Sequence, residues 1–337
     1  MIHSDKFDKP HDSIEAVRFR RSPELVRKAA VGALAVLAVF TTVSCGAETT
    51  KPTTPEMSRQ YSVKTDGVTL NVEKQGNPDA KKVVIGIHGG PGLSLESLDL
   101  LQPLAGPDQQ LVRYDQRGAG ISTAPANGNY SLDQQLADLD AVRVSTGADK
   151  VDLIGESWGG LLATAYAAEY PAHVDDLVLL DAIPLDYTEF LNGQKRFSQR
   201  LATLQESGDV PSPLPTSINN SCIAPLTAVL PAYVAKPSNP VPKDIGSCTA
   251  DVSKDSYAAI TKPGLLAAYA ADLTNFNGDA LVIAGNDDPF GKQWPDRIVS
   301  LLKNANTQQV DIQGAGHLVL FEKRDEVISD IDHFLKK

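Results

Sequence analysis

The chain has 337 residues, of which 42% are hydrophobic and 22% charged, and its formal net charge is −11 at pH 7. This length and composition suit one large globular core with an insertion, or two small domains, and exclude a disordered chain. The acidic balance and the lack of a basic stripe in the sequence exclude nucleic acid as a partner, because phosphate binding needs clustered cations.

The first 45 residues predict an export signal. A basic segment at residues 18–28 precedes an uncharged apolar run at residues 29–43, which leads into Ser44-Cys45-Gly46. The run has the length of a signal-peptide core and is short for a membrane-spanning helix, which needs about 20 apolar residues. Its end resembles a bacterial lipobox, in which Cys45 becomes the lipidated first residue after cleavage. An uncleaved signal anchor is the alternative.

Residues 46–58 are rich in Thr and Pro and predict a tether with nothing to bury. We therefore expect a domain outside the cytoplasmic membrane, held to it by a lipid anchor on Cys45 or else secreted. The cysteines also support an exported domain. Cys222 and Cys248 stand 26 positions apart in a segment rich in Pro and Ser. In an exported protein this pattern favours a disulfide between them, with two free buried thiols as the alternative.

Residues 59–183 predict the first part of an α/β core. A hairpin is expected over residues 61–74, and a continuous apolar strand over 82–87 breaks into His-Gly-Gly-Pro-Gly at 88–92. A strand at 111–115 follows, and Ser131 is placed to cap an amphipathic helix. Apolar strands that alternate with helices indicate a mostly parallel sheet with helices on both faces and sites at the carboxyl ends of strands.

The clearest signal is Gly-Glu-Ser-Trp-Gly at residues 155–159. An apolar strand at 151–154 precedes it and a helix at 161–170 follows, and this context is typical of a nucleophile elbow. In such an elbow the backbone turns sharply, so that the Ser157 hydroxyl stands above the sheet. The flanking glycines leave room for the neighbouring strand and helix.

From residue 184 to about 275 the regular alternation of apolar strands and helices is absent. The segment is rich in Pro, carries both cysteines and contains helical patches at 187–204 and 265–273, which predicts an inserted cap. Strands at 280–284 and 308–312 and a final amphipathic helix then complete the core over residues 276–337.

A serine hydroxyl needs a base, and histidine is scarce enough for elimination. His317 is the candidate, because it directly follows the last strand in Gln-Gly-Ala-Gly-His. The five other histidines lie in the signal, in the glycine-rich loop, at the opposite end of the sheet or on the last helix: His3, His11, His88, His173 and His333.

The acid that orients the base should follow the strand at 280–284. Gly-Asn-Asp-Asp-Pro at 285–289 offers Asp287 and Asp288, and Asp181 is a more distant third candidate. The oxyanion requires two backbone donors, which we expect to be the N–H groups of Trp158 and Gly90. We also expect the Trp158 indole to form a wall of the acyl pocket.

These motifs, together with Asp-Gln-Arg-Gly-Ala-Gly-Ile-Ser at residues 115–122, resemble the proline iminopeptidase branch of the α/β-hydrolases. The resemblance covers roughly residues 63–180 and 280–335. It implies an α/β-hydrolase fold with an inserted cap, and cleavage of an N-terminal residue, often proline, from a small peptide or amide. In hydrolases of this architecture the acid usually stands three residues after the glycine, which favours Asp288. Acidic cap side chains hold the substrate's amino group in that family, and Glu189, Glu206 and Asp209 are available here.

The sequence therefore predicts an exported serine hydrolase that cleaves amides of small peptides through an acyl-enzyme on Ser157, with His317 and Asp288. We expect neither a metal nor an organic cofactor. A carboxylesterase with the same triad is the alternative, because ester and amide hydrolysis share every part named. A non-catalytic surface-binding lipoprotein is a third.

Overall fold

A computed structural model describes residues 58–337. The predicted signal at residues 1–45, the tether up to residue 57 and the lipidation candidate Cys45 lie outside the described residues. Within residues 58–337, no helix is both long and apolar enough to span a membrane.

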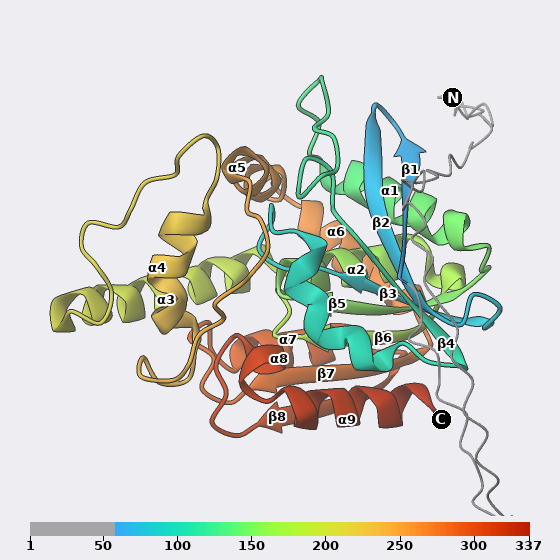
Figure 1. Ribbon diagram of the computed structural model, residues 1–337. Helices are drawn as coiled ribbons and strands as arrows, with labels where there is room; N and C mark the ends of the chain where they lie inside the picture. The colour runs from blue at the N-terminus through green and yellow to red at the C-terminus, as the bar shows by residue number, and fades with distance from the viewer. Residues whose placement is uncertain (1–57) are drawn as a thin grey trace, which may run out of the picture.

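The centre of the fold is an eight-stranded sheet with the order β1-β2-β4-β3-β5-β6-β7-β8 (Figure 1). The first two strands form an antiparallel hairpin, β2 pairs with β4 in antiparallel orientation, and every other neighbouring pair is parallel. The strands are β1 (Arg59–Thr65), β2 (Val68–Gly76), β3 (Lys82–Ile87), β4 (Gln109–Tyr114), β5 (Val151–Glu156), β6 (Val174–Leu180), β7 (Asp279–Gly285) and β8 (Asn306–Ile312). The predicted mostly parallel sheet is confirmed.

Buried apolar side chains separate into two clusters on the two faces of this sheet, because the central strands are buried at nearly every residue. One face packs against α1 (Leu132–Thr146), α2 (Trp158–Glu169) and α7 (Gln293–Leu301). The other packs against the 3-10 helix η1 (Leu95–Leu104), α8 (Val319–Glu322) and α9 (Arg324–Leu335). A short 3-10 helix η2 (Pro171–His173) leads into β6.

The segment at residues 184–275 connects β6 to β7 and carries the helices α3 (Tyr187–Ser207), α4 (Ile223–Tyr233), α5 (Ala250–Ala259) and α6 (Leu265–Asp272) and the 3-10 helix η3 (Leu273–Asn275). In Figure 1, α3, α4 and α5 lie beyond the carboxyl ends of the strands, on the left. By contrast, α6 packs against α2. The division into core parts 59–183 and 276–337 with a cap at 184–275 stays a prediction.

Two local expectations were wrong. Ser131 precedes α1, but its side chain makes no capping hydrogen bond. The helix after the elbow begins at Trp158 rather than three residues later, because the turn is completed by the single residue Ser157.

Candidate active site

Ser157 stands alone between β5 and α2 in a strained backbone conformation. Its φ is 51° and its ψ is −111°, which few residues other than glycine adopt. Its N–H donates to the carbonyl of Leu180 in β6 at 2.9 Å, and its own carbonyl accepts the N–H of Ile183 at 3.1 Å. Strain of this kind persists only where the surrounding structure enforces it, and it concentrates at functional sites.

The glycines around Ser157 are required by close backbone approach. A β-carbon on Gly159 would lie 2.0 Å from the carbonyl oxygen of Ile87 in β3, and one on Gly155 would lie 2.4 Å from the carbonyl oxygen of Gly159. Such contacts are far inside van der Waals distance. Glycine at 159 therefore lets the elbow sit against the end of β3, and glycine at 155 lets the first turn of α2 fold back onto β5.

The structure brings the three predicted catalytic side chains into one hydrogen-bonded chain. His317 Nε2 lies 2.9 Å from Ser157 Oγ, and His317 Nδ1 lies 2.8 Å from Asp288 Oδ2. The side chains of His317 and Asp288 are each only 4% exposed. This is the arrangement in which an acid orients a base and the base accepts the proton of a nucleophile.

The two alternative acids occupy other places. Asp287 is exposed, while its neighbour Asp288 turns inward toward His317. Asp181 is buried close to Asp288 and His317, and its carboxylate accepts the backbone N–H groups of Gly285 and Val319 at 2.9 and 3.0 Å. Of the three candidates, Asp288 is the one bonded to the imidazole.

Several ionisable groups around Ser157 have shifted pKa values, and burial raises that of Asp181 well above its usual range. Burial lowers the pKa of His317, but the charge and hydrogen bond of Asp288 more than offset this, so that the net pKa is raised above 6.5. Burial raises the pKa of Glu156, the residue before the nucleophile, to about 7. The charges of Asp181 and Glu156 also contribute to the raised pKa of His317.

The predicted oxyanion donors flank the serine. Trp158 is the first residue of α2, and a backbone N–H at that position has no acceptor within the helix. Gly90 lines the same cavity as Ser157, and its φ of 37° turns the loop so that its carbonyl accepts the N–H of Leu93 at 2.9 Å. The two predicted donors therefore lie at the start of α2 and in the glycine-rich loop, both beside Ser157.

The Trp158 indole does not wall the acyl pocket, contrary to expectation. It is 0% exposed, and its Nε1 donates to Gln116 Oε1 at 3.1 Å. Gln116 Nε2 in turn donates to the carbonyl of His88 at 2.8 Å. Gln116 thus ties the elbow to the glycine-rich loop, a role that residue type and spacing did not reveal. Its place in the Asp-Gln-Arg-Gly motif was the available signal.

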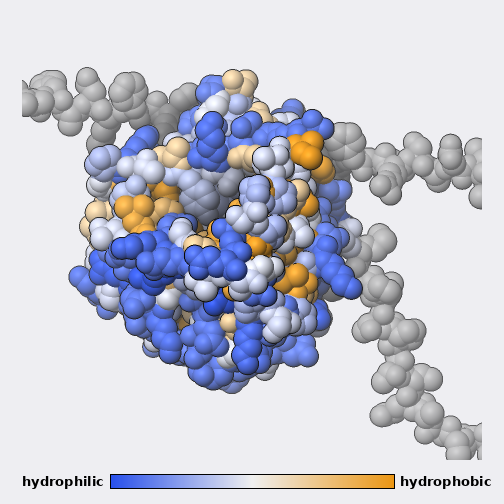
Figure 2. Space-filling view, turned by 90° about the vertical axis from the view of Figure 1, so that its left-hand side faces the viewer, coloured by the Kyte–Doolittle hydropathy of each residue, from blue (hydrophilic) through white to orange (hydrophobic). Residues whose placement is uncertain are grey.

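A cavity of about 670 Å³ opens at Ser157 and His317. Its lining is mostly apolar and comes from both the core and the 184–275 segment, with Tyr233, Tyr257, Phe290 and Trp294 nearest the triad histidine or the elbow. On the face that carries α3 and α4, apolar residues emerge in patches between polar ones (Figure 2). None of the lining residues is Glu189, Glu206 or Asp209, the acidic residues that the sequence made available for an amino group.

The 184–275 segment contacts the base directly. The backbone N–H of His317 donates to the carbonyl of Tyr233, the last residue of α4, at 2.7 Å. Glu322 strengthens this junction, because its carboxylate accepts the N–H of Gly316 at 2.6 Å and the N–H of Ala235 at 3.0 Å. The loop that carries His317 is therefore fixed against the segment as well as the core.

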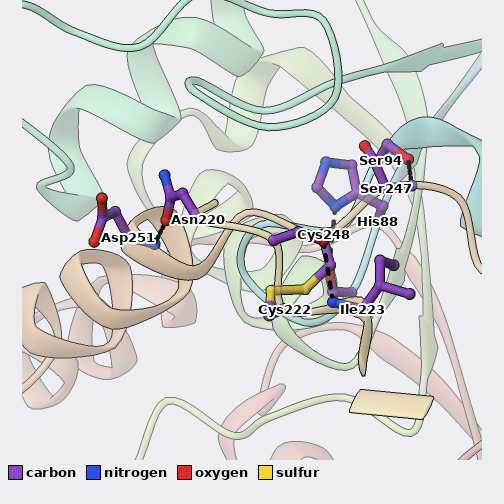
Figure 3. The surroundings of a disulfide bond; sticks show 10 residues. His88, Ser94, Asn220, Cys222, Ile223, Ser247, Cys248 and Asp251 are labelled. Carbon is purple, nitrogen blue, oxygen red and sulfur yellow. Dashed lines mark hydrogen bonds between the residues drawn. A yellow bond between two sulfur atoms is a disulfide. The ribbon is translucent and has the colours of Figure 1, made fainter. Parts of the chain in front are cut away.

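The disulfide links Cys222 and Cys248, the pair expected from the sequence. Figure 3 shows it between two further contacts: the N–H of Ser247 donates to Ser94 Oγ at 2.8 Å, and the N–H of Asp251 donates to Asn220 Oδ1 at 2.9 Å. The N–H of Thr249 also donates to the carbonyl of Gly92 at 2.8 Å. The disulfide therefore braces a stretch that is bonded to the glycine-rich loop.

The fold and this serine–histidine–aspartate geometry define a class of protein. Residues 82–324 match the family described as alpha/beta hydrolase fold, and the chain belongs to that family.

Within the family, the chain is similar to proline iminopeptidases. It is 25% identical to the proline iminopeptidase of Thermoplasma volcanium over 291 residues, which cover 82% of this chain and 96% of that protein. The proline iminopeptidase of Xylella fastidiosa is 41% identical over 116 residues, which cover 34% of this chain and 36% of that protein. Among solved structures, the proline iminopeptidase of Mycobacterium smegmatis superposes with a TM-score of 0.60 at 18% identity, over 82% of this chain and 98% of that chain. These similarities support a hydrolase enzyme.

Proposed function

We propose that this chain is a serine hydrolase that forms an acyl-enzyme on Ser157. The observation that carries the proposal is the position of His317, 2.9 Å from Ser157 Oγ and 2.8 Å from Asp288 Oδ2. Ser157 Oγ attacks the substrate carbonyl while His317 Nε2 accepts its proton. The C–N or C–O bond then breaks, and the leaving group takes that proton from His317. Water attacks the acyl-enzyme, and its proton returns through His317 to Ser157 as the acid departs.

Charge on the carbonyl oxygen in each tetrahedral intermediate would be met by the N–H groups of Trp158 and Gly90. Removal of one such donor typically costs about 10²- to 10³-fold in kcat. Asp288 holds the imidazole in the tautomer that presents Nε2 to the serine.

The substrate class we favour is a small peptide or aminoacyl amide, as in the proline iminopeptidases that the chain resembles. A specific observation supports a carboxylesterase as the second candidate. The cavity is largely apolar, and the acidic side chains expected to hold an amino group, Glu189, Glu206 and Asp209, do not line it.

One substrate panel separates these candidates. Aminoacyl anilides and short-chain nitrophenyl esters are assayed with the parent and with Ser157→Ala. Anilide turnover that is lost in the variant supports the peptidase, whereas ester turnover without anilide turnover rules it out. Failure of a fluorophosphonate to label the folded parent protein would instead favour a binding lipoprotein.

We also propose that the protein is exported and anchored through a lipid on Cys45. The basic and apolar segments before Cys45 and the tether after it support this location. The Cys222–Cys248 disulfide is consistent with it, because disulfides persist in oxidising compartments. Mass spectrometry of the mature N-terminus tests the proposal, and an unmodified Cys45 within an intact chain would refute it.

A further inference from the structure

Helix α4 presents an apolar stripe to the cavity. Leu226, Val229, Leu230 and Tyr233 occupy positions i, i+3, i+4 and i+7, so they lie on one face of the helix. All four line the cavity that contains Ser157 and His317. A stripe of this kind is normally covered by protein. Here Leu226, Val229 and Tyr233 are only partly buried, which leaves apolar surface available to a ligand.

The stripe begins at the proposed base. The ring of Tyr233 lies 5.7 Å from the imidazole of His317, measured between centroids. Leu226 lies seven residues earlier in the same helix, and at 1.5 Å per residue it is about 10 Å further along the axis. The apolar surface therefore extends about 10 Å from the triad in one direction.

Most charged side chains of the cavity are exposed, whereas the stripe on α4 is partly buried. The cavity's charged side chains other than Glu156 and His317 are exposed: Glu96, Asp99, Lys243 and Asp244. A charged substrate group along α4 would lose its hydration without gaining a counter-ion. An apolar group would bind there favourably, because its surface is removed from water.

We infer that the substrate carries an extended apolar acyl chain that lies along α4, with its carbonyl at Ser157. An extended chain advances about 1.2 Å per bond, as a polypeptide backbone does, so a 10 Å stripe accommodates about eight carbons. A cavity of about 670 Å³ is large enough for such a chain and far larger than one prolyl ring needs. The inference rests on the serine hydrolase proposed above and selects its second candidate, the carboxylesterase, because it assigns the apolar chain to the acyl group transferred to Ser157.

A series of nitrophenyl esters from acetyl to dodecanoyl tests the length. Each methylene that becomes fully buried contributes up to about fourfold in kcat/KM. We expect kcat/KM to rise with chain length up to about eight carbons and then to stop rising. An enzyme that prefers the acetyl ester, or that shows no dependence on length, would overturn the inference.

A pair of tryptophan variants on one helix tests the location. Leu226→Trp should lower the ratio of octanoyl to acetyl kcat/KM at least tenfold, because the indole occupies the far end of the stripe. Thr227→Trp is the matched control, since Thr227 is exposed on the same helix, and it should keep the parental ratio. Leu226→Ala should move the preferred length upward and provides a second test if the larger residue impairs folding. Parental ratios in a folded Leu226→Trp protein and in Leu226→Ala would show that the chain does not lie along α4.

Failure of this inference is distinguishable from failure of the proposed function. Covalent labelling of Ser157 by a fluorophosphonate together with a flat chain-length series overturns the acyl-chain inference alone. No labelling, with no turnover of any ester or anilide, overturns both.

Discussion

Asp181 accepts the backbone N–H of Val319 through Oδ2 at 3.0 Å. Its Oδ1 accepts the N–H of Gly285 at 2.9 Å, where the loop that carries Asp288 begins, and Val319 stands two residues after His317. The residue is 2% exposed and has a φ of 44°, a value that is uncommon for a residue other than glycine. The buried carboxylate of Asp181 therefore joins the loop that carries Asp288 to the loop that carries His317.

Asp181→Asn should lower kcat by about 10- to 100-fold with little change in KM. An amide has one acceptor oxygen in place of two, so one of the two loops is released, and small displacements of catalytic groups cost this much. Steady-state kinetics of the folded variant measures the effect. Asp152→Asn is the control, because Asp152 is also buried but lies near the start of β5, at the opposite end of the strands from Ser157. Equal losses in the two variants would indicate a general effect on the fold rather than positioning.

The two adjacent aspartates after β7 provide a matched pair. Asp288→Asn should reduce kcat by about 10³- to 10⁴-fold, because the imidazole is then held in the wrong tautomer. Asp287→Asn should stay within about threefold of the parent, since its side chain is exposed. Single-turnover measurements with an activated ester report the chemical step. A comparable loss in Asp287→Asn would mean that the acid is misassigned.

The pH profile should report the raised pKa of His317. The base must be neutral, so kcat/KM falls as the pH decreases through this pKa, and the midpoint of the acid limb should lie above 6.5. The groups that face the imidazole with negative charge are Asp288, Asp181 and Glu156.

Because the pKa of Glu156 is itself raised to about 7, this residue carries only part of its charge near the midpoint, and Glu156→Gln should move the midpoint slightly to lower pH. Glu96→Gln, at the exposed mouth of the cavity, should leave it in place. A parental midpoint at or below 6.5, or equal shifts in the two variants, would contradict this account.

Replacement of both Cys222 and Cys248 by Ser should lower the free energy of unfolding. The closed loop spans 26 residues, for which loss of chain entropy in the unfolded state corresponds to about 3 to 3.5 kcal/mol. Urea denaturation of the variant and of the oxidised parent gives the difference. The parent unfolded under reducing conditions should resemble the variant, and a reduced parent as stable as the oxidised form would show that the disulfide contributes little.

Sequence reasoning was strongest where a residue type is demanded by local geometry. The turn after β5 needs glycine at 159 because the end of β3 passes within contact distance, and at 155 because the first turn of α2 folds back onto it, so its pattern is visible in the chain itself. It was weakest where a side chain acts through long-range contacts. Gln116 and Glu322 each bridge elements far apart in sequence, and neither residue type nor spacing reveals which partners they contact.

By itself, the sequence determined the α/β order, the strand ends that carry the candidate residues, and the short list of Ser157, His317 and three aspartates. The order of strands and helices follows from hydrophobic periodicity, and the candidate residues follow from glycine spacing and from the small number of histidines. All of these properties can be read along the chain without knowing which segments pack together. Only the tertiary structure decided which aspartate meets the imidazole, where the Trp158 indole points and what lines the cavity. Those outcomes depend on which surfaces meet when β6, β7 and the 184–275 segment pack together, and packing partners are not encoded in any single stretch of chain.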